Sequence, residues 1–311
     1  MSATRLEFLA TGRWAGPRRG EAVIHLDDLC YVRLGTRDRV GALRFARDVL
    51  GLEPVRDECG ATYLRSDARE HTLVYCDGNP REHTVGFALR DLGDLDAAAA
   101  ALSNAGHDAR AGGAAACEQR RVAAFVNFRD PSGNSVDLVV GPEADAAQPA
   151  AAAAMGLTGF SHVGLCSIDA SRDERFWTGL FDARVSDRIG AAALLRIDSV
   201  HHKLALFPSA RPGVQHINHQ MACIDDVMRA WYRLREHGVR VVFGPGRHPT
   251  SGAVFVYFEG PDDMVYEYSA GVRLIGADEE AGYRPRQFPF AKESFCMWGA
   301  VPDIGDFSAT D

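Results

Sequence analysis

The feature that most constrains the fold of this chain is an internal duplication. Residues 27–55 and residues 158–185 both consist of a short apolar strand, a polar turn and an amphipathic helical segment. Further strands, a second strand and helix and a closing strand follow in each half. A repeat of this length is a duplicated domain, because solenoid repeats have periods of about 20–50 residues. The sequence therefore predicts two similar domains.

Matched positions in the two halves have near-constant separations. They are 131 residues for Tyr31 and His162, 136 for His83 and His219, and 130 for Asp137 and Glu267. Within each half the order of strand, helix and strands occurs twice, so we expect two βαβββ units per domain and an α+β fold. The duplication thus predicts four such units in the chain.

A change in composition marks the boundary between the halves. The segment PEADAAQPAAAAAMG, residues 142–156, is rich in alanine and proline and has no apolar periodicity. We therefore expect five parts, which are an N-terminal arm (1–23), an N-terminal domain (24–142), an Ala/Pro linker (143–156), a C-terminal domain (157–275) and an irregular tail (276–311).

Composition limits the possible partners and the compartment. The net charge of −8 argues against nucleic acid as a partner, because proteins that bind polyanions are usually basic. No apolar run approaches the roughly 20 residues of a membrane span, and the N-terminus lacks the apolar stretch of a signal peptide. The seven cysteines are scattered and form no CxxC pair, which is typical of reduced thiols. We therefore expect a cytoplasmic protein with neither nucleic acid nor membrane as a partner.

Histidines are concentrated in the second half, where seven of the eleven lie between residues 162 and 248. His162, His219 and Glu267 each lie on a predicted strand, at positions expected to face inward. A buried carboxylate needs a partner such as a metal ion. Two imidazoles and one carboxylate are the ligand set of mononuclear non-haem iron(II) enzymes, and they also suit manganese(II). An ordinary buried ion pair between His162 and Glu267 is the alternative.

The second imidazole ligand has two candidates, His219 and His216. We prefer His219, because its spacing to the following helix fits a strand-then-helix unit and because His83 occupies the matched place in the first half. His201 and His237 are expected to face solvent.

The segment GRHPTSGAVFVYFEGPDDMVYE, residues 246–267, carries a resemblance to a known family. It resembles the signature of the two-domain extradiol, ring-cleaving catechol dioxygenases of the vicinal oxygen chelate superfamily, with His248, Tyr257 and Glu267 at the functional places. The turn departs from that signature at Gly260 and Asp263. HHKLALF, residues 201–207, resembles the family segment that carries the acid–base histidine, and His202 is the better match.

The resemblance implies a function as well as a fold. It implies open, cup-shaped mixed sheets, iron(II) in the C-terminal half, dioxygen as co-substrate, a small catecholic aromatic substrate and a homo-oligomer. His202 would be the acid–base catalyst, and His248 and Tyr257 would hydrogen-bond the substrate oxygens. The first half has Tyr31 in place of the first ligand, a poor ligand near pH 7, so we expect that half to be metal-free.

Several points stay open at this stage. An apolar ring pocket is one interpretation, and core packing another, for four residues of the second half: Phe176, Trp177, Leu195 and Phe255. Arg284 and Arg286 are expected to be solvated, and contact with a carboxylated substrate is the alternative. The rival functions are a glyoxalase-type or resistance-type metalloenzyme of the same superfamily and a non-catalytic protein that sequesters an aromatic ligand. The sequence does not distinguish simple, alkyl, bicyclic, trihydroxylated and carboxylated catechols.

Overall fold

The structure is a computed structural model that describes residues 24–142 and 147–305 of the 311-residue chain. The expected N-terminal arm, residues 1–23, lies outside the described residues. So do residues 143–146 of the expected linker and residues 306–311 of the expected tail.

The first half forms one mixed sheet whose central strands are antiparallel. The sheet has eight strands in the order β2-β3-β4-β1-β5-β8-β7-β6, with β1 antiparallel to β5 and parallel to β4. The elements are β1 (Asp28–Thr36), α2 (Arg39–Phe45), the π-helical turn η1 (Ala46–Leu50), β2 (Glu53–Glu58), β3 (Ala61–Arg65), β4 (Leu73–Asp77), β5 (His83–Ala88), α3 (Leu92–Asn104), β6 (Arg110–Ala111), α4 (Ala114–Glu118), β7 (Val122–Arg129) and β8 (Ser135–Pro142).

The second half repeats this arrangement and adds an edge strand. Its order is β14-β15-β16-β13-β9-β12-β11-β10-β17, with β9 antiparallel to β13 at the centre. The elements are α5 (Ala150–Ala154), β9 (Leu157–Ser167), α6 (Ala170–Gly179), β10 (Arg184–Ile189), β11 (Ala192–Arg196), β12 (Leu204–Pro208), β13 (Gly213–Met221), α7 (Ile224–Glu236), β14 (Val241–Arg247), β15 (Val254–Glu259), the 3-10 turn η2 (Pro261–Asp263), β16 (Val265–Ala270), α8 (Ala277–Glu280), β17 (Arg286–Phe288) and α9 (Lys292–Phe295).

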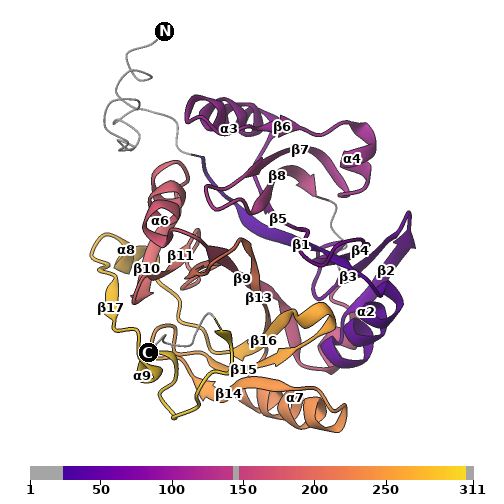
Figure 1. The fold of residues 1–311 in the computed structure, drawn as a ribbon, viewed down its shortest axis with the longest axis vertical. Coiled ribbons are helices and arrows are strands. Elements are labelled where there is room, and N and C mark those ends of the chain that lie inside the picture. Colours follow the sequence, from indigo (N-terminus) through magenta and orange to yellow (C-terminus); the bar gives the residue numbers. More distant parts are fainter. Residues whose placement is uncertain (1–23, 143–146, 306–311) are drawn as a thin grey trace.

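The predicted α+β fold of tandem βαβββ units is confirmed. Each half contains two such units, and α2, α3, α6 and α7 each follow the first strand of a unit (Figure 1). Local sequence explains where several helices begin. The side chains of Asp38, Asp91 and Asp169 accept hydrogen bonds from backbone N–H groups in the first turns of α2, α3 and α6.

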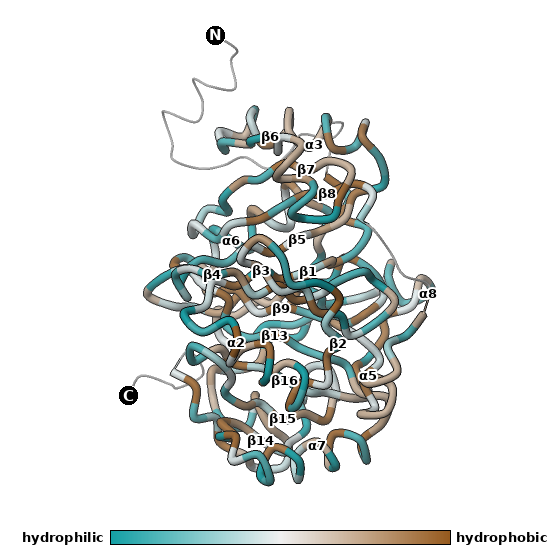
Figure 2. The backbone as a smooth tube through the Cα atoms, turned by 90° about the vertical axis from the view of Figure 1, so that its right-hand side faces the viewer, coloured by the Kyte–Doolittle hydropathy of each residue, from teal (hydrophilic) through white to brown (hydrophobic). Residues whose placement is uncertain are grey.

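A single apolar core joins the two halves. Phe45 at the end of α2 lies 5.8 Å, between ring centroids, from Tyr266 on β16. Trp177 on α6 in turn lies 5.6 Å from Phe87 on β5. Each half thus sends a helix onto the sheet of the other, and hydrophobic segments fill the middle of the molecule (Figure 2). The hydroxyl groups of Tyr75 and Tyr266 are hydrogen-bonded across the same junction.

The opposite face of the second sheet carries a separate apolar cluster, which we call the C-terminal cup. Its buried members include Leu194, Phe207, Phe243 and Phe255, and residues 286–304 contribute Phe295, Cys296 and Ile304. The segment expected as an irregular tail therefore has a structural part, because β17 pairs in parallel with β10 and extends the sheet (Figure 1).

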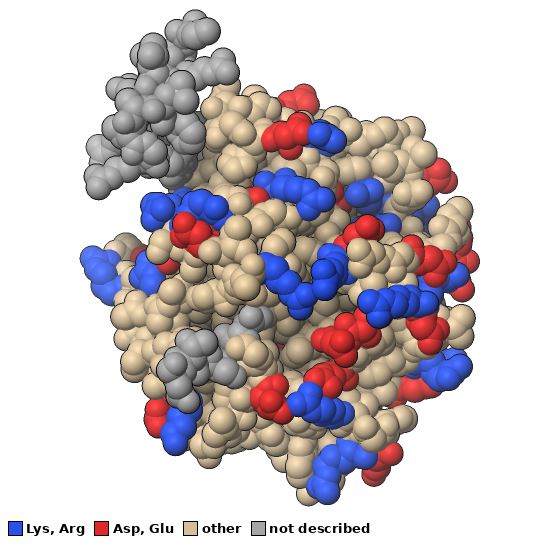
Figure 3. Space-filling view, viewed as in Figure 1, with Lys and Arg blue, Asp and Glu red and all other residues tan. Residues whose placement is uncertain are grey.

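Surface and thiol features add two further observations. Basic and acidic side chains are interspersed over the face shown in Figure 3. No helix in the described part of the chain is long and apolar enough to cross a membrane. All seven cysteines lie within the described residues, and all are free thiols.

Candidate metal centre and active site

Three side chains of the second half converge on one point. Nε2 of His162 lies 2.9 Å from Nε2 of His216 and 3.0 Å from Oε2 of Glu267. Nε2 of His216 lies 3.6 Å from the same carboxylate oxygen. Among the residues that the structure describes, these three form the one group of histidine, cysteine or acidic side chains with metal-binding proximity.

These separations fit a shared metal ion. Adjacent ligand atoms at about 2.1 Å from an octahedral ion lie about 3 Å apart. Oε2 of Glu267 is buried and, despite its closeness to His162, has no hydrogen bond of acceptable geometry. A buried carboxylate oxygen without a hydrogen bond is costly, and a cation between the three groups would remove that cost. The donor set therefore fits iron(II) or manganese(II).

Strand register brings the three candidate ligands to one face. Asn218 on β13 is the central residue, because it pairs with His162 on β9 and with Glu267 on β16. Two residues earlier on β13, His216 lies opposite Gly164. A Cβ atom at Gly164 would lie 2.5 Å from Nδ1 of His216, so the glycine makes the space that the imidazole occupies.

The structure corrects the expectation for the second ligand, because His216 rather than His219 lies in this group. His219 directly follows Asn218 on β13, so it points to the opposite face of the sheet, toward the shared core, where it lies against Phe160. Both ring nitrogens of His219 are buried without a hydrogen-bond partner. Burial lowers the pKa of His219 to about 4.

The matched position in the first half explains this placement. Phe160 pairs with His219 as Leu29 pairs with Phe87, so the counterpart of His219 is Phe87 and not His83. His219 therefore occupies a core position that holds a phenylalanine in the first half. The signal was present in the sequence, because the 136-residue separation of His83 and His219 departs from the other two separations.

Electrostatics favours an ionised Glu267 carboxylate and a neutral His216 imidazole. Burial alone would raise the pKa of Glu267, but the charge of His162, with that of His216 behind it, holds that pKa well below its ordinary value. Burial lowers the pKa of His216 to about 3, and His162 acts in the same direction. Metal ions bind a carboxylate and a neutral imidazole, so Glu267 and His216 are in the forms that bind a metal ion.

His248 and Tyr257 lie beside the ligand group. Nε2 of His248 is 3.2 Å from the hydroxyl group of Tyr257 and 3.5 Å from Oε1 of Glu267. Nδ1 of His248 donates a hydrogen bond to the backbone oxygen of Phe295, 2.8 Å away. Burial, together with the charge of Glu267, raises the pKa of Tyr257 well above its ordinary value, so its hydroxyl stays a donor. The imidazole of His248 is also stacked on Phe255, with ring centroids 3.8 Å apart.

His202 lies on the other side of the ligand group. Its ring centroid is 4.2 Å from that of His162, and its side chain is buried. The expectation that His201 faces solvent is wrong, because its side chain is fully buried between His202 and Asp187. His237 is exposed, as expected.

The remaining site expectations divide between core and surface. Phe176, Trp177 and Leu195 belong to the shared core, whereas Phe255 lies in the C-terminal cup. Arg284 is exposed. Arg286 is exposed over 45% of its side chain, as expected, and it also forms an ion pair with Asp187.

The equivalent place in the first half contains a closed polar network. Tyr31 donates to Asp137 at 2.9 Å, Nε of Arg120 donates to the same carboxylate at 2.6 Å, and Asn127 donates to it at 2.8 Å. Strand register puts Thr84 at the place of His216. A guanidinium from the same chain therefore neutralises this buried carboxylate.

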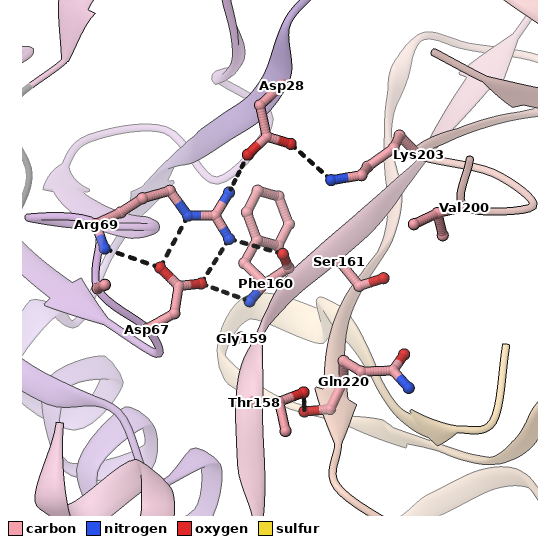
Figure 4. Close-up of a pocket in the computed structure, with 11 residues that line it drawn as sticks. Asp28, Asp67, Arg69, Thr158, Gly159, Phe160, Ser161, Val200, Lys203 and Gln220 are labelled. Atoms are coloured by element: carbon pink, nitrogen blue, oxygen red, sulfur yellow. Dashed lines mark hydrogen bonds and ion pairs between the residues drawn. The ribbon is translucent and has the colours of Figure 1, made fainter. Parts of the chain in front are cut away.

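A pocket at the junction of the halves is distinct from the ligand group. It has a volume of about 550 Å³, and none of its lining residues is a candidate ligand, His202, His248 or Tyr257. Its charged side chains are paired with one another, because Arg69 contacts Asp28 and Asp67, and Lys203 contacts Asp28 (Figure 4). The pocket therefore offers no unpaired charge to a ligand.

Each half of the chain matches the same protein family. Residues 29–138 and 159–268 each match the glyoxalase/bleomycin resistance protein/dioxygenase superfamily. A 1,2-dihydroxynaphthalene dioxygenase of Sphingobium xenophagum is 24% identical over 82% of this chain and 92% of its own length. An iron-dependent extradiol dioxygenase of Rhodococcus jostii (strain RHA1) is 26% identical over 89% and 97%.

Solved structures share the fold over nearly the whole chain. A Mn(II)-bound glyoxalase from Novosphingobium aromaticivorans has a TM-score of 0.81 and 24% identity, and the match covers 92% of this chain and 95% of that protein. A homoprotocatechuate 2,3-dioxygenase from Arthrobacter globiformis has a TM-score of 0.81 and 20% identity, with 94% and 93% covered.

Proposed function

Because this chain belongs to the glyoxalase/bleomycin resistance protein/dioxygenase superfamily, we propose that it is an extradiol dioxygenase that cleaves a catecholic ring beside its two hydroxyl groups. One observation carries the proposal. The buried group His162, His216 and Glu267 has His202 on one side and the pair His248 and Tyr257 on the other. A metal with free coordination positions, an imidazole base and a phenolic donor are the groups that this reaction needs.

His162, His216 and Glu267 would hold the metal, iron(II) in preference to manganese(II). When bound, the ion supplies a Lewis acid that lowers the pKa of the catechol and a template for substrate and dioxygen. His202 takes a proton from a catechol hydroxyl group and later returns one. Tyr257 donates a hydrogen bond to a substrate oxygen. Nε2 of His248, which lies beside the Tyr257 hydroxyl group, faces the same substrate oxygen.

The C-terminal cup supports a catechol with an apolar substituent. The cluster contains Tyr257 together with aliphatic and aromatic side chains such as Leu194, Phe207 and Phe295. A carboxylated catechol would need a cation, and Arg286 is already paired with Asp187. The curated relatives include proteins named for 1,2-dihydroxynaphthalene and biphenyl-2,3-diol, which carry apolar rings. We propose that the enzyme is cytoplasmic, because its free thiols stay reduced there. We also propose that it is a homo-oligomer.

Anaerobic reconstitution tests this function. The protein is loaded with Fe(II) or, in parallel, Mn(II), and catechol, an alkyl catechol, 1,2-dihydroxynaphthalene, biphenyl-2,3-diol and a carboxylated catechol are added with air. We expect oxygen uptake and a yellow ring-opened product, fastest with Fe(II) and with the apolar catechols. Glu267→Gln is the control and should bind little metal. Absence of oxygen uptake with every catechol would refute the dioxygenase, and conversion without oxygen would favour a glyoxalase-type enzyme.

A further inference from the structure

A line of buried polar groups leads from the surface to His202. Nδ1 of His202 lies 3.1 Å from Nδ1 of His201, and Nε2 of His201 lies 2.9 Å from Oδ2 of Asp187. Asp187 and His201 are fully buried. Neither residue touches the candidate metal ligands, and neither has a role in the function proposed above.

The carboxylate of Asp187 sets the direction of the hydrogen bonds between Asp187, His201 and His202. Arg286 donates to both oxygens of Asp187, through its backbone N–H, Nε and Nη2. Although burial opposes it, His201 and Arg286 hold the pKa of Asp187 below its ordinary value, so the group is a carboxylate and can only accept. Nε2 of His201 must therefore carry the hydrogen.

The neutral form of His201 then determines the tautomer of His202. Burial lowers the pKa of His201, so its other nitrogen, Nδ1, is a lone-pair acceptor. Nδ1 of His202 must donate to it. Nε2 of His202, on the opposite side of the ring, is left without a hydrogen and is the basic atom available to a substrate.

We propose that Asp187 and His201, clamped by Arg286, are positioning residues that hold His202 in the tautomer whose Nε2 is a base. The inference rests on the function proposed above only in its use of His202 as the acid–base residue. A carboxylate that fixes the tautomer of a catalytic imidazole is a known device in serine hydrolases. Here a second imidazole transmits the effect, and β17 supplies the clamp from the C-terminal segment.

Asp187→Asn reverses the direction of the line with little change in shape. The Oδ1 atom of Asp187 accepts two hydrogen bonds from Arg286, whereas Oδ2 accepts one from Arg286 and one from His201. The asparagine amide nitrogen should therefore take the Oδ2 position, where it loses one hydrogen bond from Arg286 and not two. From there it would donate a hydrogen bond to Nε2 of His201. His201 would then donate from Nδ1, and His202 would carry its hydrogen on Nε2.

Nitrogen-15 NMR of the histidine-labelled full chain, loaded with diamagnetic Zn(II), reads these tautomers directly. His202→Gln identifies the resonances of His202. We expect the Nδ1–H tautomer for His202 in the wild type and the Nε2–H tautomer in Asp187→Asn. The wild-type spectrum tests the proposal even if the variant does not fold, since an Nε2–H tautomer there would overturn it.

Kinetics of the Fe(II)-loaded protein gives a second readout. Asp187→Asn should lower kcat by about 10- to 100-fold, with KM for the catechol and the bound iron within about twofold of the wild type. The control is Asp173→Asn, which removes an equally buried carboxylate of the same half. The carboxylate of Asp173 accepts hydrogen bonds from the hydroxyl groups of Ser132 and Ser167 and has no contact with His201. It should lower stability and leave kcat and the His202 tautomer unchanged. An unchanged kcat in Asp187→Asn, or an equal loss of kcat in Asp173→Asn, would show that Asp187 and His201 have only a structural role.

Discussion

The hydroxyl group of Tyr31 donates to the carboxylate of Asp137 at 2.9 Å, in the place where the other half has His162 and Glu267 3.0 Å apart. Both halves therefore bury a carboxylate on the last strand beside a ring from the first strand. They differ in how its charge is neutralised. Arg120 does so in the first half, and the geometry of the second half fits a metal ion.

Removal of the guanidinium should therefore destabilise the first half. Arg120→Met leaves Asp137 buried without its cation, and we expect the free energy of unfolding to fall by about 3 kcal/mol. Urea unfolding measures this loss. The control is Arg110→Met, which breaks an exposed pair with Asp108 and should cost far less stability, because water screens that pair. Equal losses in the two variants would contradict the neutralising role of Arg120.

Metal content should separate the two candidate imidazole ligands. His216→Gln removes a nitrogen from the ligand group, so we expect at least about tenfold weaker iron binding. His219→Phe introduces the residue found at the matched position, Phe87, and should keep one iron per chain. Iron analysis after anaerobic reconstitution and desalting gives both values. Loss of iron in His219→Phe but not in His216→Gln would reverse the assignment.

The space beside His216 should be essential as well. A Cβ at Gly164 would lie 2.5 Å from Nδ1 of His216, so Gly164→Ala should displace the imidazole and lower the bound iron. Gly213→Ala is the matched control on β13, because its Cβ would meet nothing closer than Cys166 Sγ at 3.8 Å. Full iron content in Gly164→Ala would show that His216 does not need this space.

Stability should depend on pH through His219. Its pKa is about 4 in the folded chain against an ordinary value of 6.5, so between these values the unfolded chain binds more protons. The free energy of unfolding therefore falls as the pH drops from 6.5 to 4, by up to about 1.4 kcal/mol per pH unit, and is unaffected by this group above 6.5.

His219→Phe removes that dependence. Relative to the wild type, the variant should gain roughly 1–3 kcal/mol more at pH 5 than at pH 7.5 in urea unfolding. The comparison of two pH values cancels the change in packing caused by the new side chain. The same gain at both values would mean that His219 does not titrate as its burial implies.

Tyr257 should act on turnover and not on metal binding. Tyr257→Phe removes the phenolic donor, so we expect kcat to fall by roughly 10²-fold while the iron content is kept. The control is Tyr268→Phe, which removes a hydroxyl that donates to Val49 in the shared core. That variant should lose stability and keep its kcat. An undiminished kcat in Tyr257→Phe would exclude the donor role.

The repeat made most of the fold predictable, because two matched halves with alternating strands and helices leave few topologies. His162 and Glu267 could be placed because a constant separation ties them to Tyr31 and Asp137. The second candidate ligand is misassigned when His219 is matched to His83, because their separation of 136 residues departs from the other two and the counterpart of His219 is Phe87.

The surroundings of His202 were equally hidden in the sequence. The burial of His201 is not evident from the sequence, because its partner, Asp187, lies fourteen residues earlier on β10, whereas His201 lies in the connection before β12. The role of residues 286–304 was missed for a related reason, since a three-residue edge strand such as β17 has too few residues for an alternating pattern. Long-range pairing decided both outcomes.

The crossed helices give the two halves a common fate. With Phe45 against Tyr266 and Trp177 against Phe87, neither sheet can lose its partner without exposing large aromatic rings to water. We therefore expect the two halves to unfold together, so that damage to the half without the candidate metal ligands also destabilises the half that has them. The packing of the first half therefore helps to hold the geometry of the candidate metal site in the second.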